Sequence, residues 1–578
     1  MIDLKKLAID EFVTPPTKKN VGYFVVDSFI GTTFLTLKTF KESEDNILIY
    51  CANNFEVTEM YNSLTTFLDR DNIITIPNDE LLRVEYLSES KEMVSLQIYG
   101  IYSLINAKHK IIILSPSSLY KFYPTKETFL SSCLHFKVGE KYDFNKVKND
   151  LARSSYQRVS KIDQSLEYAV RGDIIDVFSL NYDNPIRIEF FDDEIESIRF
   201  FSIASQTSFE EIKEVDILPA SLNLFTEKEK ALAPVKLKER LKVDKENLSS
   251  LTYDELENQI NEDIEDLKES NINSRFYKYT GYLQETNEDL LGFLTNPYKI
   301  IINNEDDFIR SRDNLFEEAD NFLLELFKEG KSVSGLKYFN QTINVLNRSS
   351  FTYYLNNFYI HDSSISIDIT TNSLYSTRDI DITRLFDMYI KNGYKIMCLL
   401  SNKEQVDKTK QALDNLNLSY SLTTDFNLDE TKDVSLSINT FVKGFEFKDK
   451  KIVVLTSKEL FGFRRHVSTY SSKFKEGIIL GSYQDLEPGD YVVHEKSGIG
   501  RFVKISTLEI EGKHEDYIQI QYDGGDVLYV PLYQFNLIRK YVGKEGYAPK
   551  LNRLYTNKWE ATKKRIKQKI NDLAERLM

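Results

Sequence analysis

The segment from Tyr23 to Tyr50 reads YFVVDSFIGTTFLTLKTFKESEDNILIY and decides the fold class that the sequence predicts. Its two ends, Tyr23–Val26 and Ile47–Tyr50, are short apolar runs bounded by polar residues, which is typical of buried strands. Between them, Thr33–Lys41 has the apolar spacing of a helix. A strand, a helix and a second strand in this order predict a parallel α/β unit.

The same alternation continues to about residue 130. We expect a helix over Phe55–Phe67, a strand at Ile73–Ile76, a helix over Met93–Ile105 and a strand at Ile111–Leu114. This order is typical of a nucleotide-binding type of domain, in which helices cover a parallel sheet.

The turn after the first strand has the position of a phosphate loop without its chemistry. Such a loop needs glycines whose backbone amides wrap the phosphates, and a lysine that reaches the terminal ones. Here Val26 stands in place of the first glycine, and Thr32, between Gly31 and Thr33, stands in place of the lysine. We interpret Gly31, Thr32 and Thr33 as a degenerate, inactive phosphate loop, which can form but holds nucleotide poorly.

No other segment supplies a catalytic or metal site. The string Gly330-Lys-Ser ends like a phosphate loop, but it follows an amphipathic helix and has Glu325 at the position of the first glycine. The six histidines are scattered, and the three cysteines show no metal-ligand spacing. We therefore expect no enzyme activity, no cofactor and no metal in this chain.

Composition favours protein partners over nucleic acid. The chain has 578 residues with 74 basic and 89 acidic side chains, a net charge of −15. Weak or absent DNA binding is expected, because clustered lysine and arginine drive most nonspecific affinity for nucleic acid. The sequence has no run of about 18 apolar residues that could span a membrane. With few cysteines and no secretory signal, we expect a cytoplasmic monomer.

Two later segments resemble a known repair module. They read YAVRGDIIDVF over Tyr168–Phe178 and PIRIEFFDDEIESIRFF over Pro185–Phe201, and they resemble the UvrB homology module. That module occurs in the DNA-damage protein UvrB and in the bacterial transcription-repair coupling factors. Further on, VVHEKSGIGR over Val492–Arg501 and LYVPL over Leu528–Leu532 resemble the RNA-polymerase-interacting domain of the coupling factors, which is related to the CarD regulators. UvrB has no such domain, and its phosphate loop is intact, so the resemblance favours the coupling factors.

The resemblance implies an α/β multidomain fold. Its expected parts are a degenerate P-loop-type parallel α/β domain, an inserted α+β module that binds UvrA, a small α/β domain, a Tudor/SH3-like β-barrel and a helix that leads to a motor. The degenerate α/β domain is expected over residues 1–131 and 221–345, and the inserted module over 132–220. The small α/β domain is expected over 346–475, the barrel over 485–545 and the helix over 555–578. Within 221–345, the spacing of Leu256, Ile260, Ile264 and Leu267 predicts one apolar face of a helix.

The resemblance also assigns a UvrA-binding site. In the coupling factors two arginines and a phenylalanine bind UvrA, and they fall here on Arg171, Arg187 and Phe191. Arg187 and Phe191 lie at odd positions of one alternating strand, so they share a face, which we expect to be exposed to solvent. The alternative is that they only stabilise the sheet.

A second site is implied in the barrel. The polymerase contact of the family falls on Leu508, with Thr507 and Glu509 beside it in the strand. An exposed strand edge can add to a sheet of the RNA polymerase β subunit, with the side chain giving specificity. The alternative is that Leu508 belongs to the barrel core.

Together these features predict a scaffold that tethers stalled RNA polymerase and recruits UvrA for nucleotide excision repair. The complete proteins of the family continue into an ATP- and magnesium-dependent DNA translocase, which does not follow Met578, so we expect the front part of such a protein. Two alternatives stay open: a UvrB-like ATP-dependent damage-binding subunit, and a CarD-like transcription regulator.

Overall fold

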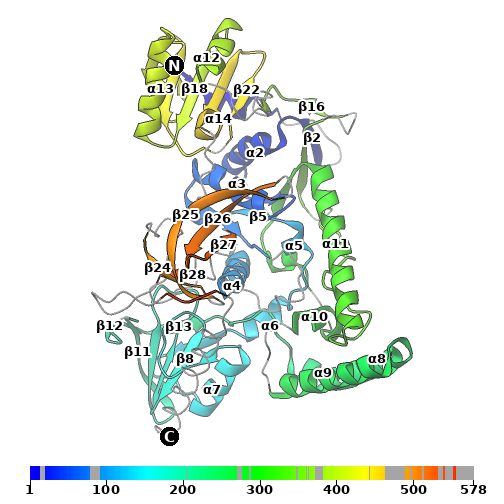
Figure 1. Ribbon diagram of the computed structural model, residues 1–578. Helices are drawn as coiled ribbons and strands as arrows, with labels where there is room; N and C mark the ends of the chain where they lie inside the picture. Colours follow the sequence, from blue (N-terminus) through cyan, green and yellow to red (C-terminus); the bar gives the residue numbers. More distant parts are fainter. Residues whose placement is uncertain are drawn as a thin grey trace. The chain divides into compact units, whose positions relative to one another are not determined.

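The computed structural model forms two compact units, Met1–Lys475 and Glu476–Met578, each considered by itself (Figure 1). The residues that it describes are 1–13, 20–78, 91–203, 205–269, 272, 276–285, 288–346, 349–358, 361, 363–371, 382–441, 443–461, 489–494, 497–510, 513–531, 538–540 and 551–554. No helix among them is long and apolar enough to cross a membrane.

The centre of the first unit is a parallel sheet of seven strands in the order β16-β2-β15-β14-β3-β5-β4. In chain order its strands are β2 (Val21–Val25), β3 (Asn46–Tyr50), β4 (Ile73–Thr75), β5 (Ile111–Leu114), β14 (Tyr298–Asn303), β15 (Phe351–Asn356) and β16 (Ile365–Ser366). The predicted parallel α/β architecture is thereby confirmed.

Helices cover both faces of this sheet, because its strands are apolar on both sides. In β3, Ile47 and Ile49 join one buried core, whereas Leu48 and Tyr50 join the core on the opposite face. The helices on the first face are α2 (Ser28–Glu42) and α3 (Asn54–Thr65), and those on the second are α4 (Lys91–Ile105) and α11 (Glu305–Lys328).

The inserted module is a six-stranded sheet in the order β12-β11-β10-β9-β8-β7. Its strands are β7 (Gln157–Arg158), β8 (Glu167–Arg171), β9 (Ile174–Val177), β10 (Ile186–Phe191), β11 (Glu194–Phe201) and β12 (Ser208–Ile212). All neighbours are antiparallel except β7 and β8. Helix α7 (Phe144–Arg153) and the pair β6 (Leu134–Lys137) and β13 (Glu214–Ile217) complete it. This antiparallel sheet with a helix agrees with the inserted α+β module expected from the sequence.

A helical pair follows the module. Helices α8 (Glu227–Asp244) and α9 (Ser250–Glu269) pack against each other and against α10 (Tyr277–Leu283). The predicted apolar stripe of α9 is fully buried in this core, at Leu256, Ile260, Ile264 and Leu267.

The domain boundary expected between residues 345 and 346 does not coincide with the end of the first parallel sheet. Strand β15 lies after that boundary, yet it pairs on both sides with strands of the first sheet, β2 and β14. Strand β16 also pairs with β2. The first α/β layer therefore extends past residue 346, because the α11 crossover carries the chain into a neighbouring parallel strand.

The second sheet of this unit has six strands in the order β17-β22-β23-β18-β21-β19. They are β17 (Thr370–Thr371), β18 (Lys395–Leu400), β19 (Tyr420–Leu422), β21 (Val434–Ile438), β22 (Phe445–Phe447) and β23 (Ile452–Thr456). Helices α12 (Ile382–Lys391) and α13 (Lys403–Asn415) pack on one face. The other face shares a core with α2, through side chains such as Met397 and Phe34.

The second unit contains an antiparallel sheet in the order β27-β26-β25-β24-β28. Its strands are β24 (Tyr491–His494), β25 (Gly498–Ile510), β26 (Lys513–Gln521), β27 (Val527–Pro531) and β28 (Ile538–Lys540). A Tudor/SH3-like barrel was expected here, and closure of this antiparallel sheet into a barrel stays a prediction. The expected helix 555–578 lies outside the described residues.

Candidate functional site

The residues expected to form a phosphate loop are helical. Helix α2 begins at Ser28, so Gly31, Thr32 and Thr33 are buried inside it rather than in a loop before it. The expected loop and the expected helix start at Thr33 are therefore wrong. Only Val26 and Asp27 separate β2 from α2, which leaves no backbone to wrap a phosphate.

Asp27 explains why the helix starts early. Its side chain accepts a hydrogen bond from the backbone N–H of Ile30 at 2.9 Å and so caps the helix. The same carboxylate forms an ion pair with Lys443 Nζ at 3.1 Å. The Asp27 carboxylate thus satisfies the amide groups at the helix N-terminus, which in other proteins are available to hold a phosphate.

Gly31 has a packing role in this arrangement. A Cβ atom at this position would lie 2.5 Å from Val26 Cγ1 and 2.9 Å from Leu355 Cδ2. The glycine therefore allows α2 to pack closely against Val26, just after β2, and against Leu355 of β15, and this packing alone explains a glycine here.

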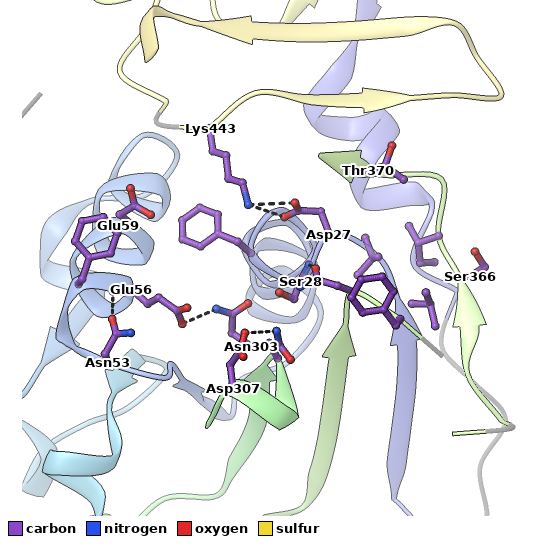
Figure 2. A pocket seen from close by; sticks show the side chains of 18 of the residues that line it. Asp27, Ser28, Asn53, Glu56, Glu59, Asn303, Asp307, Ser366, Thr370 and Lys443 are labelled. Carbon is purple, nitrogen blue, oxygen red and sulfur yellow. Dashed lines mark hydrogen bonds and ion pairs between the residues drawn. The ribbon is translucent and has the colours of Figure 1, made fainter. Parts of the chain in front are cut away.

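A pocket of about 710 Å³ lies at the carboxyl ends of the parallel strands, beside the start of α2 (Figure 2). Its lining includes Asp27, Glu56, Glu59, Asp307, Lys443 and Lys458. Figure 2 shows Lys443 reaching down to Asp27, and Glu56 of α3 reaching toward Asn303 at the end of β14. This edge is where open parallel sheets place their ligand sites.

In the inserted module, Arg187 is held inside the sheet. Its guanidinium donates to both carboxylate oxygens of Asp176, at 2.8 and 2.9 Å, and lies over the ring of Phe201 at 4.7 Å. Its side chain is 15% exposed and that of Asp176 is 2% exposed. Hydrogen bonding to Asp176 raises the pKa of Arg187 above its ordinary value. On a face expected to be exposed to solvent, Arg187 is therefore only partly exposed, because Asp176 opposite it needs a partner.

Phe191 and Arg171 are the exposed members of the expected UvrA-binding set. The ring of Phe191 is 74% exposed at the end of β10. Arg171, at the end of β8, is exposed and donates from Nη2 to the carbonyl of Ser160 at 2.9 Å. Neither residue belongs to a buried core of the described chain.

Strand register places all three residues on one face. Asp176 of β9 lies opposite Arg187 of β10, and Ile174 lies opposite both Glu189 of β10 and Arg171 of β8. Residues directly opposite each other, and residues two apart, project to the same side of a sheet. The predicted common face of Arg187 and Phe191 agrees with the alternating burial of β10.

Sequence reasoning missed Asp176 as a functional partner. The signal was present, because Asp176 stands between Ile175 and Val177, which are fully buried, and a buried carboxylate requires a partner. The pair of Glu189 and Arg199, 3.3 Å apart on the same face, was missed as well.

In the second unit, the expected polymerase site lies on a long strand. Residues Thr507, Leu508 and Glu509 belong to β25, and Leu508 is opposite Glu515 of β26. Strand β24 pairs with β25 only over residues 498–501. Among the described strands, the remainder of β25 therefore pairs on one side only, with β26.

Comparison with known families matches two of these regions. The UvrB interaction domain matches residues 134–222, which cover the inserted module. The CarD-like/TRCF RID domain matches residues 486–542, which cover the antiparallel sheet of the second unit. The two resemblances read from the sequence are thereby confirmed.

Curated relatives match along almost the whole chain. The transcription-repair-coupling factor of Bacillus subtilis (strain 168) is 28% identical over 546 residues, which are 93% of this chain and 46% of that protein. The protein of the same name from Staphylococcus aureus (strain bovine RF122 / ET3-1) is 28% identical over 554 residues, 93% of this chain and 47% of its own length. The chain thus spans about half the length of the curated relatives that it matches.

Proposed function

We propose that this chain, a relative of the transcription-repair coupling factors along 93% of its length, is a docking protein with two binding ends. The inserted module recruits UvrA, and the sheet of the second unit holds the RNA polymerase β subunit. Two separate docking domains on one chain raise the effective concentration of one partner near the other. The role requires no nucleotide chemistry in this chain, which fits the ion pair of Asp27 and Lys443 at the start of α2.

The observation that carries the UvrA end of the proposal is the exposed ring of Phe191. A phenylalanine that is 74% exposed contributes little to folding, whereas aromatic and arginine side chains dominate protein interfaces. Phe191 and Arg171 share a face at the same end of the sheet, next to the β8–β9 turn. We assign them as the contact residues. Arg187 supports this face from within through Asp176, as a positioning residue.

Binding to UvrA tests this end directly. The double variant Arg171→Ala, Phe191→Ala should lower the affinity for purified UvrA by roughly 30-fold, the size of a hot-spot loss of about 2 kcal/mol. The matched control is Phe209→Ala, which removes another exposed phenylalanine, 57% exposed, from the edge strand β12 of the same sheet. Equal affinities of the parent and a folded double variant would reject this face and favour a CarD-like regulator.

The polymerase end rests on the one-sided pairing of β25. A strand whose second edge is open can extend a sheet of a partner through main-chain hydrogen bonds. Leu508→Ala should weaken binding to the isolated β subunit by about tenfold, as expected for an interface side chain. Tyr529→Ala on β27, where the ring is 43% exposed, is the control. Loss of binding in the control alone would place the contact on the other edge of the sheet.

A further inference from the structure

The pocket beside α2 has an excess of acceptors and negative charge that the docking role does not explain. Both of its lysines are already paired: Lys443 with Asp27 at 3.1 Å, and Lys458 with Glu59 at 3.6 Å. Two further carboxylates, Glu56 and Asp307, line the same pocket. Its net charge is therefore negative, which is the opposite of what a nucleotide requires.

Glu56 has no cationic partner within 4.0 Å among the described residues. It accepts one hydrogen bond from the backbone N–H of Ala52 and one from Asn303 Nδ2, both at 3.0 Å. Asp307 accepts a hydrogen bond from Asn304 and lies 3.5 Å from Arg310, whose side chain is 69% exposed. An exposed pair of this kind contributes little and leaves the carboxylate able to bind another cation.

Asn303 shows that the hydrogen bonding of the pocket wall is incomplete. The residue is 2% exposed and lines the pocket between Glu56 and Asp307 (Figure 2). Its Nδ2 is used by Glu56, but its Oδ1 is buried without any hydrogen-bond partner. An unsatisfied buried acceptor costs about 1–3 kcal/mol, so the wall of the pocket beside Glu56 is not arranged for stability alone.

The size of the pocket decides between a metal ion and an organic cation. In the part of the chain that the structure describes, no group of three or more His, Cys, Asp or Glu side chains is arranged to hold a metal ion. A volume of about 710 Å³ is instead that of a site for a small organic molecule. Phe55 and Phe358, 63% and 79% exposed, line the pocket and offer ring faces on which a planar cation can stack.

We propose that this pocket binds an organic cation with a guanidinium group, held by Glu56 and Asp307, with Asn303 positioning Glu56 through its Nδ2 hydrogen bond. A guanidinium is planar, has five N–H donors and pairs with carboxylates through two bonds at once, so it matches a set of convergent acceptors better than an ammonium does. The source can be a free small molecule or an arginine side chain of a partner. The proposal does not depend on docking to UvrA or to polymerase.

Calorimetric titration of the full chain at low salt tests the proposal with three probes. Agmatine represents a free guanidinium compound, a blocked Gly-Arg-Gly peptide represents an arginine side chain, and ATP is the anionic comparison. We expect saturable binding of agmatine or of the peptide and none of ATP. Binding of the peptide alone would identify the source as a protein side chain; binding of neither cation, or binding of ATP in this pocket, would overturn the proposal.

Variants locate the binding. Glu56→Gln keeps an acceptor for Ala52 and removes the charge, and it should weaken cation binding at least tenfold. Asp307→Asn should act in the same direction, and it keeps the test valid if the first variant does not fold. The matched control is Glu317→Gln, at an exposed position of α11 outside the pocket lining. An equal loss in the control would show only general charge attraction and would reject the site.

Discussion

The start of α2 and the face of the inserted module differ in what they leave exposed beside their paired charges. At α2, Asp27 and Lys443 join segments that are distant in the sequence, and the Asp27 carboxylate also caps the helix. In the module, one charged pair, Arg187 and Asp176, is also satisfied internally, but Phe191 at the end of the same strand is left exposed. In the first region the charges pair with each other, whereas the second leaves an aromatic ring exposed beside its paired charges.

This difference fits the proposed function, in which the start of α2 holds no nucleotide and the inserted module docks to UvrA. Losing the lysine alone would leave a loop that could still form. Here the loop itself is absent, because Asp27 caps a helix that begins at Ser28. In the module, by contrast, internal pairing of Arg187 supports the sheet that presents Arg171 and Phe191.

The largest effect is expected from an attempt to restore the phosphate-binding lysine. Thr32 is fully buried within α2, so Thr32→Lys would place an unpaired charge in the core. We expect a loss of about 4 kcal/mol in the free energy of unfolding and no gain in ATP binding. Urea unfolding followed by circular dichroism, together with an ATP titration, measures both. The control Asn314→Lys, at an exposed position of α11, should change neither.

An outcome opposite to this one would break the comparison. If Thr32→Lys had the stability of the parent and bound ATP, the start of α2 would be able to rearrange into a working phosphate loop. The two regions would then differ only by one side chain and not by their backbone.

A smaller effect is expected in the module. Arg187→Ala leaves Asp176, 2% exposed, without its cation, and should cost about 2 kcal/mol, less than for a fully buried pair because Arg187 is 15% exposed. Hydrogen exchange of the β9 and β10 amides reports the opening of this module by itself. The double variant Arg187→Met, Asp176→Leu should recover most of the loss, since it removes both charges.

Unchanged exchange in Arg187→Ala would contradict the supporting role. Arg187 would then be available as a direct contact with UvrA, as the family resemblance alone suggests. The UvrA affinity of the stable double variant separates the two roles. If Arg187 only supports the sheet, the double variant should bind UvrA like the parent; if Arg187 contacts UvrA, the affinity should fall.

Much of the first unit could be predicted from short apolar runs. Strands such as Ile47–Tyr50 and Ile111–Leu114 are buried on both faces, and such runs read as parallel strands without any alignment. The shared face of Arg187 and Phe191 also followed from alternation along β10. These features are local, so a single sequence carries them.

The remainder depended on contacts between distant segments. The partner of Asp27 is 416 residues away, so no spacing could indicate that the start of α2 was occupied. Strand β15 lies beyond the boundary expected after residue 345, and its pairing with β14 is made through the long crossover helix Glu305–Lys328, which no local pattern indicates. The burial of Arg187 was the exception, since the apolar neighbours of Asp176 already pointed to a paired carboxylate.

The smallest effect concerns the charge that the α2 pocket keeps. Burial raises the pKa of Glu56 above its ordinary value, the nearby carboxylates of Asp307 and Glu59 act in the same direction, and hydrogen bonds from Ala52 and Asn303 oppose them. The folded protein therefore binds a proton at Glu56 more tightly than the unfolded chain does. Its contribution to stability is greatest below the ordinary pKa of 4.5 and is lost as the pH rises through the raised value.

Replacing Glu56 by glutamine removes this dependence on pH. Near pH 4 the parent and Glu56→Gln should be about equally stable, because the Glu56 carboxyl is then protonated and neutral, as glutamine is. Toward pH 7 the variant should become the more stable of the two, by roughly 0.5 kcal/mol. Thermal unfolding at several pH values measures the difference, and Glu317→Gln should show none. If Glu56→Gln instead became less stable than the parent as the pH rises, Glu56 would have a cationic partner. The carboxylate would then be paired, as Asp27 is with Lys443, and would not be available to a ligand.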